Sequence, residues 1–142
     1  MAGKRTLAII KPDAFGAAKA GKIIAHLEAQ GFTIVVARVL RLTHAQAEEF
    51  YAVHRERSFY RSLVSFMTSG PCMPMVLEKA NAVAAYRDAI GATDPAEAKA
   101  GTVRKLFAES KERNAVHGSD SDENAEREAR FFFSDTELLA SR

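Results

Sequence analysis

The sequence predicts an α+β protein built on a four-stranded, mainly antiparallel sheet. Short runs of β-branched and apolar residues alternate with helical patterns in the order strand, helix, strand, helices, strand, helices, strand. The connections between successive strands are long, and no repeat, linker or low-complexity segment interrupts residues 1–142. We therefore expect one domain, a ferredoxin-like sandwich with helices packed on one face of the sheet.

The composition narrows the class of protein. A chain of 142 residues buries a core without disulfides or a structural metal. A net charge of +2 and the lack of a continuous basic stripe argue against nucleic-acid binding. The single cysteine, Cys72, indicates a reducing compartment. The apolar run 7–10 is too short for a signal-peptide core or a membrane span, so we expect a cytoplasmic protein with no membrane partner.

The first strand, 5–10, is β-prone and ends where Pro12 removes a backbone donor. Lys11 therefore stands at a strand end, where it is either an ordinary solvated lysine or an ammonium directed into a cleft. Ile23 and Leu27 have helical spacing, and Gly31 suits the left-handed residue that ends a helix.

The second strand is predicted at 32–42, followed by a helix that opens with a capping box formed by Thr43 and Gln46. Aromatic and charged residues mix between Phe50 and Tyr60, as in an amphipathic helical hairpin with its rings in the core. For Phe59 the alternative is a partly exposed ring that stacks on a nucleobase. Local pattern does not decide between the two.

The third strand, 73–77, is a short apolar run suited to an inner position. A helix at 81–90 follows, and Asp94 caps the start of another. The segment 101–104 opens a short helix, where backbone amides and Arg104 are able to hold an anion. The run 131–133, three phenylalanines, is predicted as the fourth strand, and it is buried.

His117 lies among small and hydroxyl residues in the stretch 114–121. A neutral imidazole offers a nitrogen lone pair near pH 7, which suits phosphoryl transfer. From local chemistry alone, His117 is either this nucleophile or a loop histidine beside a helix cap. Because neither GxxxxGK[ST] nor GxGxxG occurs, any nucleotide must be bound by side chains.

Five segments together resemble the nucleoside diphosphate kinase family, in its bacterial form, and the resemblance runs from Arg5 to Phe133. The segments occur in the family's order: 5–14 (RTLAIIKPDA), 66–71 (FMTSGP), 91–95 (GATDP), 101–104 (GTVR) and 114–121 (NAVHGSDS). The resemblance implies transfer of the γ-phosphoryl group of a nucleoside triphosphate, mainly ATP, to a nucleoside diphosphate. It also implies a ping-pong mechanism through a phosphohistidine.

The family pattern assigns a role to each matching residue. His117 matches the nucleophile, Glu128 the carboxylate that holds its far ring nitrogen, and Ser119 the hydroxyl that supports this glutamate. Other matching residues hold the phosphates (Arg87, Thr93, Arg104), bond the sugar hydroxyls (Lys11, Asn114), lie close to the nucleophile (Tyr51) or stack on the base (Phe59). Lys11 also lies near the transferring phosphate, and Mg²⁺ bridges the phosphate oxygens without a ligand from the protein.

The sequence departs from the family pattern at Ser58, where proline is common, at Tyr60, where phenylalanine is common, and at Lys79-Ala80, where Gly-Glu is usual. Loss of the proline frees the backbone before Phe59, so we hypothesise a looser nucleotide-binding hairpin and a higher KM. The resemblance further implies a dimer-based homo-oligomer. The short tail after Phe133 favours a tetramer over a hexamer.

Overall fold

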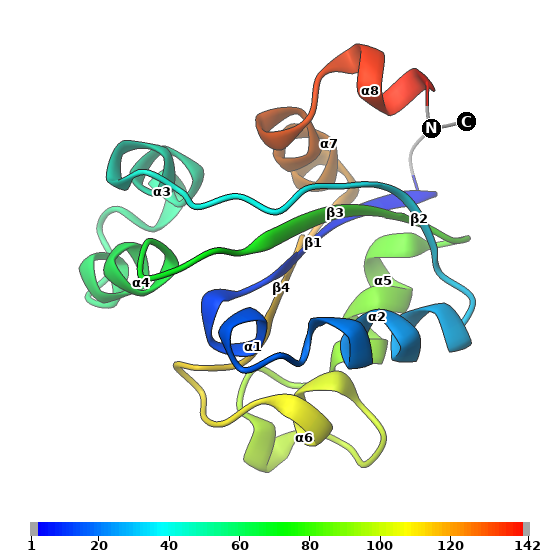
Figure 1. Cartoon of the computed structure of the whole chain (residues 1–142), viewed down its shortest axis with the longest axis horizontal. Coiled ribbons are helices and arrows are strands. Elements are labelled where there is room, and N and C mark those ends of the chain that lie inside the picture. Colours follow the sequence, from blue (N-terminus) through cyan, green and yellow to red (C-terminus); the bar gives the residue numbers. More distant parts are fainter. Residues whose placement is uncertain (1–2, 141–142) are drawn as a thin grey trace.

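A four-stranded sheet lies at the centre of the computed structural model, which describes residues 3–140 (Figure 1). Its strands are β1 (Arg5–Ile10), β2 (Thr33–Ala37), β3 (Met73–Glu78) and β4 (Val116–Gly118), in the order β2-β3-β1-β4. Every pairing between neighbours is antiparallel. The predicted α+β class and antiparallel sheet are confirmed.

Helices fill the connections between the strands. Between β1 and β2 lie α1 (Pro12–Gly16) and α2 (Ala20–Ala29), and between β2 and β3 lie α3 (His44–Phe50), η1 (Ala52–His54) and α4 (Tyr60–Met67). Between β3 and β4 lie α5 (Ala82–Ile90), η2 (Pro95–Glu97) and α6 (Val103–Phe107), and after β4 come α7 (Asp122–Phe132) and α8 (Asp135–Ala140). Within residues 3–140, no helix is long and apolar enough to cross a membrane.

Helices cover both faces of the sheet, so the prediction of helices on one face is wrong (Figure 1). Leu7 and Ile9 of β1 pack in one core with residues of α3, α4 and α7. Ala8 and Ile10, which point the other way, pack in a second core with residues of α2, α5 and α6. The continuous apolar run of β1 is typical of a strand buried on both faces.

The predicted fourth strand at 131–133 is also wrong. Phe131 and Phe132 belong to α7, and Phe133 ends that helix in an extended conformation. The run continues the helical spacing of Ala125 and Ala129, whose buried side chains lie on the same face as Phe132. The fourth strand is β4, three residues long, which places His117 in the sheet opposite Ile9 of β1.

Several local predictions are confirmed. Thr43 and Gln46 form the complete capping box at the start of α3, and β3 is an inner strand. The second strand is shorter than the predicted 32–42. Its ladder to β3 has a bulge between Ile34 and Val36. Beyond β2, a backbone hydrogen bond from Arg38 to Pro74 and an isolated bridge between Leu40 and Cys72 continue the pairing.

Candidate active site

A cavity of about 640 Å³ opens where β1 and β4 meet α5 and α6. It brings together five of the predicted site residues, which come from distant parts of the sequence: Lys11, Arg87, Thr93, Arg104 and His117. With Lys99, two guanidinium and two ammonium groups thus line one cavity with an imidazole, together with the carboxylates of Asp88 and Glu97. Such a set of donors fits a polyphosphate.

The carboxylate of Glu128 holds the His117 ring in one orientation. The Nε2 atom of His117 lies 2.8 Å from Oε1 of Glu128, which is buried on α7. The Ser119 hydroxyl donates to the same carboxylate oxygen at 2.8 Å. Because an ionised carboxylate only accepts hydrogen bonds, Nε2 carries the ring proton and Nδ1 keeps its lone pair. Ser119, Glu128 and His117 are therefore joined in one hydrogen-bonded group.

Gly118 lets the core approach the backbone directly after His117. A Cβ atom at this position would lie 2.8 Å from the Cε2 ring atom of Tyr86, which is too close for any side chain. Tyr86 is fully buried on α5, and its ring therefore packs directly on the strand that carries His117. This close approach sets the distance between β4 and α5.

Lys11 is buried at the end of β1, not solvated. Its Nζ donates to Oδ1 of Asn114 at 2.9 Å, so the two residues predicted to bond the sugar hydroxyls lie in contact. Burial, reinforced by the charge of Arg104 and opposed by that of Asp13, lowers the pKa of Lys11 to about 8. An anion that binds beside Lys11 would therefore stabilise its charged ammonium form.

Arg104 is buried as well, and it ties the walls of the cavity together. Its guanidinium donates to the backbone carbonyls of Gly91 at 3.0 Å, Val116 at 2.9 Å and Asn114 at 3.3 Å. Burial lowers the pKa of Arg104. Arg87, by contrast, is exposed at the cavity rim, as is Thr93.

A row of rings leads from His117 to Phe59. The ring centroid of buried Tyr51 lies 6.2 Å from that of His117 and 6.4 Å from that of His54. His54 in turn lies 5.3 Å from Phe59. Phe59 does not line the cavity that contains His117. It is 42% exposed, whereas Phe50 is buried in the core. The structure thus leaves Phe59 accessible to a planar ligand.

Sequence reasoning gave no role to three residues of this region. Asp13 accepts a hydrogen bond from the backbone of Ala115 at 3.0 Å, Thr102 lines the cavity, and His54 links Tyr51 to Phe59. Asp13 stands in the Lys-Pro-Asp segment that follows β1, so its nearness in sequence to Lys11 was the one available signal.

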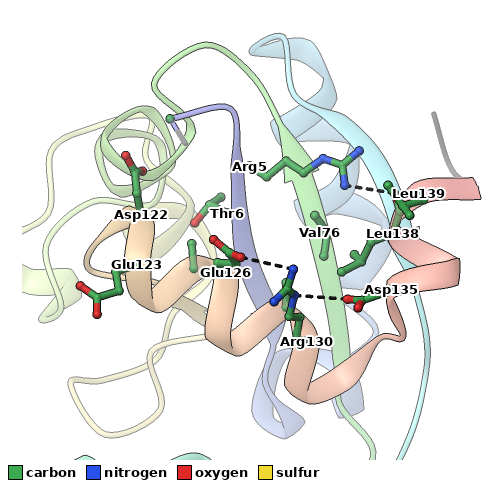
Figure 2. Close-up of a pocket in the computed structure, with 13 residues that line it drawn as sticks. Arg5, Thr6, Val76, Asp122, Glu123, Glu126, Arg130, Asp135, Leu138 and Leu139 are labelled. Carbon is green, nitrogen blue, oxygen red and sulfur yellow. Dashed lines mark hydrogen bonds and ion pairs between the residues drawn. The ribbon is translucent and has the colours of Figure 1, made fainter. Parts of the chain in front are cut away.

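A second cavity, of about 590 Å³, lies between α7, α8 and the start of β1 (Figure 2). Figure 2 shows Arg130 between Glu126 and Asp135, at 3.4 and 3.2 Å, and Arg5 donating to the carbonyl of Leu138. None of the predicted site residues lines this cavity. The Arg130–Asp135 ion pair and the hydrogen bond from Arg5 to Leu138 link α8 to α7 and to β1.

Known proteins resemble this chain over nearly its full length. The sequence profile of the family described as Nucleoside diphosphate kinase matches residues 4–138. A nucleoside diphosphate kinase of Chlorobium luteolum is 59% identical over 138 residues, covering 97% of this chain and 99% of the relative. One of Halorhodospira halophila is 55% identical over 140 residues, covering 99% of each.

A solved structure agrees with the sequence matches. The nucleoside diphosphate kinase of Aquifex aeolicus superposes with a TM-score of 0.92 at 44% identity, covering 94% of this chain and 97% of that one. The arrangement of four antiparallel strands and their helices is therefore that of the family. The chain belongs to the nucleoside diphosphate kinase family, whose members are nucleotide-binding, divalent-metal-dependent phosphotransferases.

Proposed function

We propose that His117 takes the γ-phosphoryl group of a nucleoside triphosphate, mainly ATP, and passes it to a nucleoside diphosphate in a ping-pong reaction. The observation that carries this proposal is the contact between His117 Nε2 and the buried carboxylate of Glu128. That contact leaves Nδ1 as the nucleophile in a cavity lined by cations.

In the first half-reaction the Nδ1 lone pair attacks the γ-phosphorus, and the bond from that phosphorus to the β-γ bridging oxygen breaks. The nucleoside diphosphate leaves with the electron pair of that bond. Glu128 keeps the proton on Nε2 and stabilises the positive charge that develops on the ring. In the second half-reaction a terminal oxygen of the acceptor diphosphate attacks the phosphorus, and the electron pair of the N–P bond returns to Nδ1.

The other residues position the nucleotide. Arg87, Thr93 and Arg104 hold the phosphates, because all three line the cavity that contains His117. Lys11 and Asn114, whose Nζ and Oδ1 atoms lie 2.9 Å apart, bond the sugar hydroxyls. Tyr51 packs beside His117 and supports its ring, and Phe59 stacks on the base. Because stacking does not distinguish the edges of bases, many bases are tolerated. Broad sugar tolerance is part of the same proposal and is taken from the family resemblance.

Mg²⁺ is the proposed metal, and it enters on the nucleotide. The donors around His117 are chiefly cationic, so the cavity holds phosphate oxygens and the phosphates hold the metal. When bound, Mg²⁺ would neutralise charge on the phosphates during transfer. The cavity is lined by four cationic side chains and by the two carboxylates of Asp88 and Glu97. The described residues include no group of three or more histidine, cysteine, aspartate or glutamate side chains that would hold a metal ion without the nucleotide.

We further propose one domain spanning residues 1–142 that forms a dimer-based homo-oligomer, a tetramer being favoured over a hexamer, in the cytoplasm. The two cores that share a single sheet support one domain. The buried free thiol of Cys72 fits a reducing compartment. The outer edge of β2 has no partner strand in the described part of the chain, and such an edge is a ready site for association.

The test is to incubate the protein with γ-labelled ATP and Mg²⁺, remove free nucleotide, and follow the label on the protein. We expect a label that is lost in acid, kept in base and transferred to added GDP. His117→Ala should abolish labelling. An exposed histidine offers a matched control, so His44→Ala should label as the wild type does.

A second candidate is a nucleotide-binding scaffold without catalysis. It is separated from the first by the same experiment, because a scaffold would bind ATP but take no label. Folded, nucleotide-binding wild-type protein that stays unlabelled would decide for the scaffold.

A further inference from the structure

A strained turn directly precedes the nucleophile. Ala115 has a φ of 75°, in the region that favours glycine, and it is fully buried. The amide of Val116 donates to the carbonyl of Asn114 at 2.9 Å. A hydrogen bond between residues two apart, around a central residue with this φ, defines a γ-turn of the rare and strained kind. The turn joins Asn114 to the strand that carries His117.

Asp13 holds the centre of this turn. Its Oδ2 accepts a hydrogen bond from the Ala115 amide at 3.0 Å, while the Lys11 amide donates to the Ala115 carbonyl at 2.9 Å. Both polar backbone groups of the strained residue are thus bound by the segment that ends β1 and begins α1. Arg104 holds the carbonyls on either side, those of Asn114 and Val116.

Asp13 is otherwise little used. Its Oδ1 is buried and has no hydrogen-bond partner among residues 3–140. It does not line the cavity that contains His117. The one side-chain hydrogen bond of Asp13 in the described part of the chain is accepted from Ala115, and an alanine at positive φ persists only when its surroundings hold it there.

We propose that Asp13 is a positioning residue that keeps the γ-turn at Ala115 closed and so sets the position of His117 and Asn114 for transfer. The inference rests on the proposed function for its kinetic consequence. Without the Asp13 carboxylate, the buried Ala115 amide loses its acceptor and the turn opens toward an unstrained φ. The strand from Val116 onward then shifts against Glu128, and the in-line geometry is lost.

Four variants separate this role from the alternatives. Asp13→Ala removes the acceptor, and Asp13→Asn keeps an acceptor oxygen but removes the charge. Ala115→Gly removes the strain, because glycine adopts positive φ freely, and it is combined with Asp13→Ala in a double variant. Glu28→Ala, an exposed carboxylate on α2, controls for the loss of one negative charge.

The first readout is the single-turnover rate of His117 labelling at saturating ATP. We expect Asp13→Ala to be slower by about tenfold, the population change that corresponds to ~1.4 kcal/mol of strain. Asp13→Asn and Glu28→Ala should label near the wild-type rate. The double variant should recover most of the rate although its thermal unfolding temperature stays low. A purely structural role predicts instead that rate and unfolding temperature fall together.

Two kinetic results would overturn the proposal. If Asp13→Ala labels His117 at the wild-type rate, the γ-turn at Ala115 stays closed without the Asp13 carboxylate. Equal losses in Asp13→Asn and Asp13→Ala would show that Asp13 acts through its charge on Lys11, since Asp13 raises the pKa of that lysine.

The second readout does not depend on labelling. Nitrogen NMR of the His117 ring should give a single tautomer protonated on Nε2 in the wild type and a mixture in Asp13→Ala, with the single form restored in the double variant. If the wild type takes no label, the proposed function fails while these spectra still test Asp13. Identical spectra in wild type and Asp13→Ala would overturn the role of Asp13 alone.

Discussion

Three charged residues of the site are buried where local sequence favours solvent: Lys11, Arg104 and Glu128. Lys11 donates to Asn114, and Arg104 donates to three backbone carbonyls. Glu128 is hydrogen-bonded to His117 and Ser119. Burying charge is costly unless such partners are present. At the scale of single residues, burial is therefore what separates these groups from ordinary surface charges.

Glu128→Ala should slow the labelling of His117 by roughly 10- to 100-fold. Hydrogen bonds to a charged group contribute about 1.5–3 kcal/mol, and a loss of that size in the transition state gives this range. The nucleotide affinity should change little, because Glu128 does not line the cavity. Glu126→Ala, an exposed position on the same helix, is the matched control. Labelling at the wild-type rate in Glu128→Ala would contradict the orienting role.

Lys11 should make nucleotide binding weaker as the pH rises through about 8, its pKa in the free protein. A bound phosphate favours the ammonium form and raises this pKa, so above pH 8 binding must take up a proton. Affinity should then fall by up to tenfold per pH unit. Calorimetry at pH 9 in two buffers of different ionisation enthalpy measures the proton uptake. Lys11→Met should bind with no uptake at this step.

At the scale of elements, the hairpin of α3, η1 and α4 carries Phe59, the ring that we propose stacks on the base. The Tyr60 hydroxyl donates to the carbonyl of Glu48 at 3.0 Å and so ties α4 back to α3. This tyrosine, where phenylalanine is common in the family, therefore adds a contact. Lys79 also has a local partner, since its Nζ donates to the carbonyl of Gln30 and lies over the ring of Phe32.

Ser58→Pro should lower the KM for nucleotide about two- to fivefold without changing kcat. Proline at a compatible position favours the ordered state by about 0.4–1 kcal/mol, which corresponds to this factor. The Ser58 amide donates no backbone hydrogen bond in the described structure, so the substitution sacrifices none. Steady-state kinetics with ATP and several diphosphates provide the measurement. An unchanged KM would remove the idea of a looser hairpin.

At the scale of the molecule, one sheet brings together residues that are far apart in the sequence. β1 lies between β3 and β4, so Lys11 at its end comes next to Asn114 and His117. α7 packs on the face of the sheet opposite to α5 (Figure 1). It supplies Glu128, whose carboxylate contacts His117. The site therefore forms only when both cores have formed.

The purified protein should elute as a stable oligomer with a mass that is a multiple of 15.5 kDa, at least a dimer and preferably a tetramer. The unpaired edge of β2, whose middle residues 34–36 are half-buried, leaves apolar surface to cover. Light scattering over a hundredfold range of dilution tests this expectation. A stable monomer at all concentrations would contradict it.

The sequence by itself determined the order of most helices and strands and the capping box at Thr43, because each depends on residues adjacent in the chain. It pointed to His117 as the candidate nucleophile only through the resemblance of five separate segments to one family, since local chemistry left that histidine undecided. Only the tertiary structure decided that both faces of the sheet are covered, that β4 and not 131–133 is the fourth strand, and that Lys11 is buried. The physical reason is that a three-residue strand has no periodicity to detect, and burial is set by neighbours distant in sequence.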